Sequence, residues 1–224
     1  MRSWDDLFEQ ARFHWREPDP GVVTCASRWK AEGRHKVYDL GCGAGRHLAY
    51  LGAEDFEVYG TDVAPKGLAA CRRYLDELGL EARLVQADMI AAPFADESFE
   101  AAISTNVLNH GSRARLQLAA NELFRVLMPG AEAFLTVLNT RDWRHGNGAQ
   151  IEPGSFVLAD GPEAGILHHF FSEPDLRDWL KAFEILHLER ERGELKLSTR
   201  PDDRPVIRDG WAVLLRKPRH PKSP

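Results

Sequence analysis

The chain has 224 residues, of which 43% are hydrophobic and 28% charged, a composition typical of a globular protein and not of a disordered one. Its 29 Lys and Arg residues against 34 Asp and Glu residues give a formal net charge of −5, which disfavours non-specific binding to nucleic acid. Its three cysteines have no CxxC spacing and predict neither a disulfide framework nor a zinc site, and no apolar run is long enough to predict a membrane span or a signal peptide. We therefore expect a soluble α/β protein, cytoplasmic, with all 224 residues in a single domain.

The first 35 residues are expected to form a helical cap on this domain. Ser3 and Asp6 resemble a capping box, and apolar residues then recur at helical spacing as far as Trp15. A second amphipathic segment extends from Val22 to Trp29. Aromatic stripes of this kind usually serve packing, but the two helices could also form a lid over a site, and the sequence leaves both interpretations open.

Between residues 36 and 138, short apolar segments alternate with amphipathic ones. Strands are expected at 36–40, 57–61, 82–86, 99–104 and 133–138. Helices are expected at 48–52, from Pro65 to Gly79, and from Leu116 through Leu127 to a stop at Pro129-Gly130. This alternation predicts a doubly wound, Rossmann-like sheet that is mostly parallel and has helices on both faces.

Residues 139–171 interrupt the alternation and are expected to be an insertion after the fifth strand. They are rich in Gly and Pro and contain two β-like runs, 155–159 and 166–171, which favour a hairpin. The insertion and the N-terminal helices are the expected covers of a substrate site.

Residues 172–224 are expected to hold a helix, a strand pair and a frayed basic tail. The helix follows Ser172 and buries apolar residues as far as Phe183. The two strands are expected at 184–188 and 211–216, which brings the predicted sheet to seven strands.

A glycine-rich turn follows the first strand, in the segment Asp39-Leu40-Gly41-Cys42-Gly43-Ala44-Gly45-Arg46. Glycines between a strand and a helix let a ligand approach the backbone. The spacing is G-x-G-x-G, and Arg46 stands where a dinucleotide-binding turn would need glycine. Asp62, after the second strand, can accept hydrogen bonds from ribose hydroxyls, and Asp39 would favour a ligand ammonium group. The pattern suits a nucleoside with an amino-acid tail.

This turn and four later segments, in the same order, resemble the class I S-adenosylmethionine-dependent methyltransferases. The four segments are Gly60-Thr61-Asp62-Val63, Gln86-Ala87-Asp88-Met89, Pro93-Phe94-Ala95-Asp96-Glu97-Ser98-Phe99-Glu100 and Glu122-Leu123-Phe124-Arg125-Val126-Leu127-Met128-Pro129-Gly130. Ala131 departs from the family, which has a second glycine there. The resemblance implies S-adenosylmethionine as cofactor and S-adenosylhomocysteine as product. The cofactor-binding residues expected from it and from the turn are Asp39, Gly41, Cys42, Gly43, Gly45, Arg46, Asp62, Val63, Asp88, Met89 and Asn106.

The acceptor is expected above the carboxyl end of the fourth strand. There, Asn106 should contact the methionine part of the cofactor, and His110 is the candidate general base, because a histidine can be neutral near pH 7. His110 could equally cap the following helix. His168 and His169 are neighbours on an expected strand and should point to opposite faces. No spacing among the nine histidines predicts three metal ligands together, so no metal is expected.

The sequence therefore favours methyl transfer to an O, N or S atom of a small-molecule substrate, by a monomer or homodimer that contacts no membrane. Nucleic acid is disfavoured as a partner, because the Asn/Asp-Pro-Pro-Tyr/Phe/Trp and Pro-Cys motifs of base-modifying methyltransferases are absent. Two alternatives stay open. One is an RNA or protein methyltransferase that uses Arg113, Arg115 and the basic tail, and the other is a noncatalytic subunit that binds S-adenosylmethionine. A nicotinamide dehydrogenase is a weaker rival.

Overall fold

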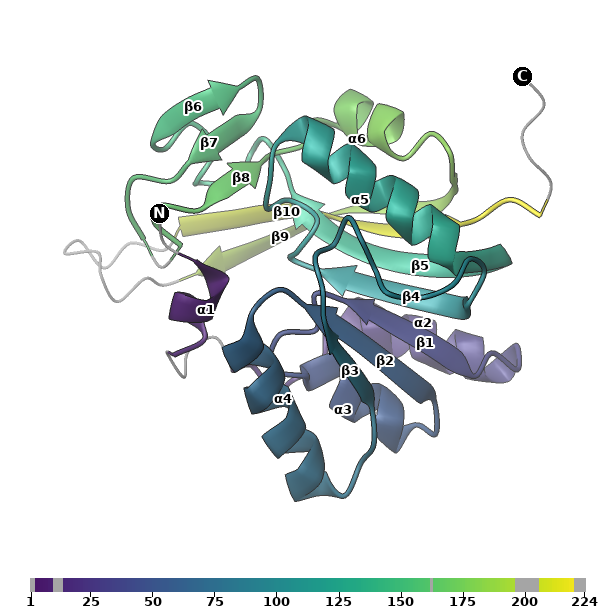
Figure 1. The fold of residues 1–224 in the computed structure, drawn as a ribbon. Helices are drawn as coiled ribbons and strands as arrows, with labels where there is room; N and C mark the ends of the chain where they lie inside the picture. Colours follow the sequence, from purple (N-terminus) through teal and green to yellow (C-terminus); the bar gives the residue numbers. More distant parts are fainter. Residues whose placement is uncertain (1–2, 10–13, 162, 196–205, 220–224) are drawn as a thin grey trace.

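The computed structural model describes residues 3–9, 14–161, 163–195 and 206–219. Among these residues, the main sheet has seven strands in the order β3-β2-β1-β4-β5-β10-β9 (Figure 1). Strands β1 to β5 are parallel, and β10 is antiparallel to both β5 and β9. The strands are β1 (Lys36–Leu40), β2 (Glu57–Asp62), β3 (Arg83–Gln86), β4 (Phe99–Thr105), β5 (Leu127–Leu138), β9 (Glu184–Leu195) and β10 (Val206–Arg216). The prediction of a doubly wound, seven-stranded and mostly parallel sheet is confirmed.

Helices cover both faces of this sheet, because successive strand residues point to opposite sides. Val37 and Ile103 face a core made with α2, α3 and α4, whereas Tyr38 and Ala102 face a second core made with α5 and α6. The helices are α2 (Pro20–Ala31), α3 (Arg46–Ala53), α4 (Pro65–Leu78), α5 (Arg113–Val126) and α6 (Glu173–Trp179). Among the described residues, no helix has both the length and the apolar character needed to cross a bilayer.

The N-terminal helix is much shorter than the sequence predicted. The capping box forms, since the Ser3 side chain accepts from the Asp6 backbone and the Asp6 side chain accepts from the Ser3 backbone, but α1 (Trp4–Leu7) is a single turn. The carbonyl of Phe8, at the end of this turn, accepts a hydrogen bond from the His14 ring at 2.9 Å. Trp15 therefore lies outside any helix, and the predicted stripe residue between them, Ala11, lies outside the described residues.

The second N-terminal segment is the helix that was predicted. Asp19 caps α2 by accepting from the backbone of Gly21, and Pro20 occupies its first position. Val22, Ala26 and Trp29 are buried against the sheet. This helix is thus part of the core, and only α1 is placed to cover a site.

Two boundaries of the core differ from expectation. Helix α5 ends at Val126, because Leu127 already has extended backbone and pairs with Phe99 of β4. Pro129 and Gly130 consequently lie inside β5 and do not stop the helix. Helix α6 ends at Trp179, although the predicted residue Phe183 is buried beyond its end.

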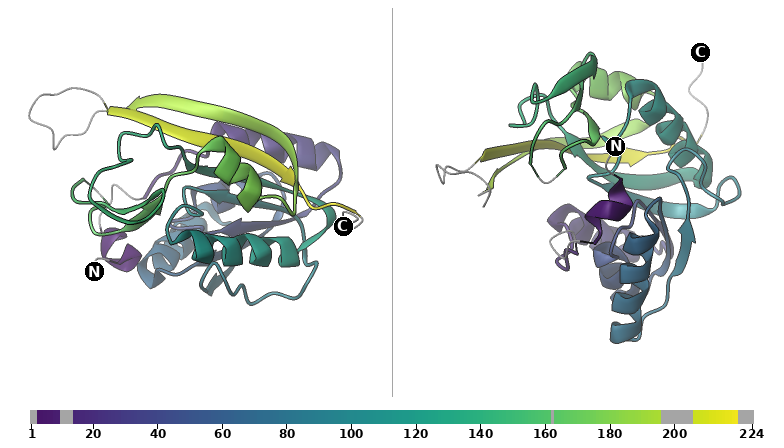
Figure 2. Two further views of the ribbon diagram at one scale, coloured as in Figure 1. Left: turned by 90° about the horizontal axis from the view of Figure 1, so that it is seen from above. Right: turned by 60° about the vertical axis from the view of Figure 1, so that its left-hand side comes forward.

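The insertion forms a small antiparallel sheet of β6 (Ala149–Glu152), β7 (Ser155–Val157) and β8 (Leu167–His169). The predicted hairpin is β7–β8, and β6 was missed because its residues are mostly exposed and carry no apolar pattern. Figure 2 shows this sheet and α1 at the same end of the molecule, to which the carboxyl ends of the parallel strands point.

The C-terminal strands are longer than predicted, and the tail is not frayed where it begins. β9 and β10 form an antiparallel ribbon that reaches well past the five or six residues expected of each. Lys217, the first residue of the predicted tail, is buried, and its Nζ donates to the Leu127 carbonyl at 2.8 Å. Residues 220–224 of the tail and residues 196–205 of the connection predicted between the two strands lie outside the described residues.

A buried carboxylate in β5 joins this strand to α2 and to β10. Glu132 in β5 is fully buried and accepts from the indole Nε1 of Trp29 at 3.0 Å and from Arg216 at 2.9 Å. Arg28 donates to the same carboxylate. A buried carboxylate is tolerated only when its charge and lone pairs are satisfied, so the three donors are needed where they stand.

We expect Glu132→Ala to lower the free energy of unfolding by about 3–5 kcal/mol, since it leaves the guanidinium groups and the Trp29 indole without their acceptor. Urea denaturation measures this change. The control is Glu81→Ala, an exposed residue, for which a change of no more than about 0.5 kcal/mol is expected. Equal effects of the two substitutions would show that the buried carboxylate adds nothing to stability.

Candidate active site

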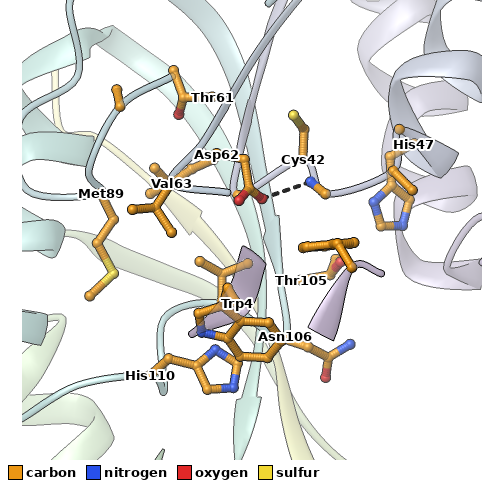
Figure 3. A pocket seen from close by; sticks show the side chains of 18 of the residues that line it. Trp4, Cys42, His47, Thr61, Asp62, Val63, Met89, Thr105, Asn106 and His110 are labelled. Carbon is orange, nitrogen blue, oxygen red and sulfur yellow. Dashed lines mark hydrogen bonds between the residues drawn. The ribbon is translucent and has the colours of Figure 1, made fainter. Parts of the chain in front are cut away.

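A cavity opens at the carboxyl ends of the parallel strands (Figure 3). The turn Gly41–Gly45 forms one wall. Asp62, the last residue of β2, and Met89, which follows β3, line the cavity as well, as do Asn106 and His110, which follow β4. Of the predicted site residues, the cavity brings together Gly41, Cys42, Gly43, Gly45, Arg46, Asp62, Val63, Asp88, Met89, Asn106 and His110.

The turn depends on glycine at two positions in particular. Gly41 has φ 81°, and a Cβ there would lie 2.4 Å from a methyl group of Val107 on the opposite wall. Gly45 has φ 86° and a Cβ there would lie 2.4 Å from the Sγ of Cys71. Any side chain at either position would be strained and would collide with a neighbour. The backbone is therefore exposed to the cavity where a ligand can approach it.

Cys42 contributes its backbone rather than a reactive thiol. Its side chain is buried, and a hydrogen bond with Cys71, together with burial, raises the pKa of the thiol well above its ordinary value. A thiol that holds its proton this firmly is a poor nucleophile. These contacts make the Cys42 side chain a packing group in the turn.

Asp62 connects the end of β2 to the turn. One carboxylate oxygen accepts from the Gly43 amide at 2.8 Å and the other from the Ala64 amide at 2.8 Å. Burial raises the pKa of Asp62, and these two backbone hydrogen bonds oppose the shift. Each carboxylate oxygen has a second lone pair, so Asp62 can still accept from hydroxyl groups of a ligand in the cavity.

Asp39 lies beneath the turn and does not line the cavity. Its Oδ2 is fully buried without a hydrogen-bond partner. His47 accepts from the Asp19 amide through Nε2, so its protonated Nδ1 faces Asp39, but at 3.9 Å it is too far to bond. Burial raises the pKa of Asp39 to about 8, against the lowering effect of Arg46. Its predicted contact with the cofactor stays a prediction.

Three of the predicted cofactor-binding side chains are held by protein partners. Arg46 donates to the Glu17 carbonyl at 3.2 Å and to the Thr105 hydroxyl at 3.4 Å. Asp88 forms an ion pair with Arg115, and the side-chain oxygen of Asn106 accepts from Arg208. Asn106 also has a positive φ of 57°, which turns its backbone toward the cavity side of β4. These contacts fix the side chains but leave their roles as predictions.

His110 lines the cavity from the loop that follows β4. Its ring packs against Trp4 of α1, with 4.5 Å between centroids, and against His168 of β8, with 4.7 Å between centroids (Figure 3 shows the first pair). Burial and the neighbouring His168 hold the pKa of His110 well below its ordinary value. The ring is therefore neutral at pH 7, as a general base must be.

His168 and His169 point to opposite sides, as predicted. His168 contacts Glu163 at 3.0 Å, and His169 contacts Asp175 at 2.7 Å and the Ser155 hydroxyl at 2.8 Å. Glu163 lines the cavity and was missed in the sequence, and its contact with His168 depends on how the insertion folds.

The reasoning from spacing that no three metal ligands come together was wrong. His110, Glu163 and His168 have ligand atoms that all lie within 4.8 Å of one another. The first comes from the loop after β4 and the other two from the insertion, so no short sequence spacing could have revealed the group.

Comparison with known proteins identifies the region around the cavity. Residues 37–130 match a family model described as a methyltransferase domain. The chain is 39% identical over 97 residues to a demethylmenaquinone methyltransferase of Thermus thermophilus, a match that covers 42% of this chain and 43% of that protein. It is 27% identical over 187 residues to a botryococcene C-methyltransferase of Botryococcus braunii, covering 77% of this chain and 46% of that protein.

Among solved structures, a SAM-dependent methyltransferase of Methanosarcina mazei superposes with a TM-score of 0.72 at 23% identity, covering 91% of this chain and 100% of that one. This similarity supports the fold. The chain spans less than half the length of the two curated relatives named above.

We predict that Asp39 gives the stability of the protein a pH dependence. Because the pKa of Asp39 is raised to about 8, its stabilising contribution is present below about pH 4, where the unfolded side chain is also protonated, and is lost as the pH rises through about 8. Asp39→Asn cannot ionise. Its free energy of unfolding, relative to the unsubstituted protein, should rise by about 2–4 kcal/mol between about pH 5 and about pH 9.

Urea denaturation at the two pH values measures this difference. Asp76→Asn, at an exposed position on α4, is the control, and its difference from the unsubstituted protein should be the same at both. A pH-independent effect of Asp39→Asn would mean that Asp39 ionises as an ordinary aspartate.

Proposed function

The chain belongs to the class I S-adenosylmethionine-dependent methyltransferases, and from this premise we propose that it transfers the methyl group of S-adenosylmethionine to an O, N or S atom of a small-molecule acceptor. The observation that carries the proposal is the meeting of the glycine turn, Asp62 and the ends of β3 and β4 in one cavity. When bound, S-adenosylmethionine supplies an electrophilic methyl group on a sulfonium, and the product is S-adenosylhomocysteine.

The residues around the cavity fit the parts of this cofactor. Asp62 keeps lone pairs for the ribose hydroxyls, and Val63 and Met89 offer apolar surface to the adenine. Gly41, Gly43 and Gly45 line the cavity without side chains, so the methionine part can lie against the backbone of the turn. Asp39 is buried beneath the same turn, and a ligand that carries ammonium and sulfonium groups would favour its ionised form, because a nearby positive charge stabilises a carboxylate.

The acceptor would occupy the other end of the cavity, beside His110. Trp4 and Phe8 of the α1 region and Trp15 line the cavity with aromatic surface, which excludes water and aligns a small acceptor with the methyl group. His110 is the proposed proton acceptor where the acceptor atom is protonated at neutral pH. The names of the two curated relatives, which refer to a demethylmenaquinone and a botryococcene, support a small-molecule acceptor.

The arginines that could have bound RNA are engaged in ion pairs. Arg113 pairs with Asp175 at 2.8 Å and with Asp178 at 3.3 Å, and Arg115 pairs with Asp88. Arginines whose charge is already neutralised gain little from a phosphate backbone, which favours the small-molecule acceptor.

We expect Asp62→Asn to weaken the binding of S-adenosylhomocysteine by about 1–3 kcal/mol, roughly 5- to 150-fold in Kd, since an amide replaces a charged acceptor at the ribose. Isothermal titration calorimetry measures the change. Asp76→Asn is the matched control and should leave Kd unaltered. An unaltered Kd for Asp62→Asn would place the ribose elsewhere.

The reaction itself is tested by measuring S-adenosylhomocysteine release from the purified protein and S-adenosylmethionine, over a panel of phenols, quinones, amines, thiols, unactivated alkenes and RNA. Acceptor-dependent release is expected with small molecules that carry O, N or S nucleophiles. Release with RNA alone would support the alternative acceptor, release with alkenes alone would point to carbon, and cofactor binding without any release would support a noncatalytic subunit.

A further inference from the structure

The acceptor end of the cavity contains a group of three potential metal ligands: His110, Glu163 and His168. Their ligand atoms all lie within 4.8 Å of one another. His110 and Glu163 line the cavity, whereas His168 is fully buried behind them. We call these three residues the His-Glu-His group.

The hydrogen bonds of His168 determine which of its ring nitrogens faces Glu163 without a proton. Its Nδ1 lies 3.1 Å from the Ile166 carbonyl, which can only accept, so Nδ1 carries a hydrogen. In the neutral ring, Nε2 therefore presents a lone pair, and it lies 3.0 Å from Oε2 of Glu163. An ionised carboxylate also only accepts. Two facing acceptors at this distance need positive charge between or beside them. Arg144, which donates to the same oxygen of Glu163, supplies part of it, and a proton on His168 or a bound cation would supply the rest.

The charges around Glu163 leave room for such a cation. Arg144 donates to Glu163 at 3.0 Å, but it also donates to both oxygens of the fully buried Asp142, at 2.7 and 3.1 Å. These three groups together carry one positive and two negative charges. Arg144 therefore does not neutralise both carboxylates, and one negative charge stays next to the two imidazoles.

We propose that the His-Glu-His group binds a divalent transition-metal cation such as Zn²⁺. Two imidazole nitrogens and one carboxylate oxygen are the donors of many catalytic zinc sites and of non-haem iron sites. The hydrogen bond from Nδ1 of His168 to a backbone carbonyl is also the usual way in which a ligating histidine is oriented. The separation of 3.0 Å between His168 Nε2 and Glu163 Oε2 is close to the ligand–ligand spacing of about 3.3 Å in a tetrahedral zinc site, and the nearest ligand atom of His110 lies within 4.8 Å of both.

Three protein ligands would leave a coordination position open toward the cavity. If the function proposed above is right, an acceptor hydroxyl could bind there, and the cation would lower its pKa so that its proton passes to solvent water before the methyl group is transferred. His110 would then be a metal ligand in place of the general base.

The test is calorimetric titration of ZnCl₂ into the full chain after treatment with a chelator, without cofactor or acceptor. One Zn²⁺ per chain is expected to bind with a micromolar or tighter Kd, and Co²⁺ should give the visible absorption of a low-coordinate site. Glu163→Gln and His168→Ala should each weaken Zn²⁺ binding at least 10-fold. The control is His187→Ala, an exposed histidine on β9, which should have no effect.

Thermal unfolding of each variant establishes that it is folded, and His110→Ala provides a third ligand substitution at a less buried position. Absence of stoichiometric Zn²⁺ binding, or binding that Glu163→Gln and His168→Ala leave unaltered, would overturn the site and identify the His168–Glu163 contact as an imidazolium–carboxylate pair. Titration of S-adenosylhomocysteine on the same preparation separates the two proposals. A chain that binds S-adenosylhomocysteine but not Zn²⁺ overturns only the metal site.

Discussion

The candidate site depends on the way the turn after β1 is attached to β2. The amides of Gly41 and Cys42 both donate to the carbonyl of Thr61, at 2.8 and 2.9 Å. Only a left-handed residue lets two successive amides point at one acceptor here, and Gly41 provides that conformation. This attachment brings Asp62 within hydrogen-bond distance of the Gly43 amide, and α3 starts directly after the turn, at Arg46. The backbone of the turn lines the cavity.

The sequence predicted those parts of the molecule in which local signals agree with the tertiary structure. The parallel core alternates strands and helices, and its turns carry glycine and proline where the backbone requires them, as at Gly79, which ends α4 with φ 66°. Its predicted site residues follow consecutive strands whose carboxyl ends meet at one edge of the sheet, so topology alone brings them together.

The errors occur where tertiary contacts decide. The apolar residues from Trp4 to Trp15 have helical spacing, yet α1 ends after one turn. The indole rings of Trp4 and Trp15 line the cavity instead. Leu127 has a helical position in the pattern but pairs with Phe99 as a strand. The approach of Glu163 to His110 depends on the fold of a loop-rich insertion, for which no periodicity exists to be detected.

Ionisable groups buried in this protein are of two kinds. Glu132 accepts hydrogen bonds from side chains of α2 and β10, and these contacts serve to hold α2, β5 and β10 together. Asp39 and the Glu163–His168 pair, in contrast, have incomplete or mutually competing partners; Asp39 lies beneath the turn that lines the cavity, and Glu163 lines the cavity itself. Groups of the second kind reduce stability, and their concentration at one place indicates that binding rather than folding accounts for them.

The two covers of the cavity are in contact with each other. Leu7 of α1 and Ile166 of the insertion are both buried, and they form a small apolar cluster with Trp4 and Phe8 that is separate from the main cores. Moving α1 away would expose apolar surface on both elements at once, at a cost of roughly 25 cal/mol for each Å². Separation of α1 from the insertion is therefore opposed by the hydrophobic effect itself, and their contact can reform without any new polar interaction.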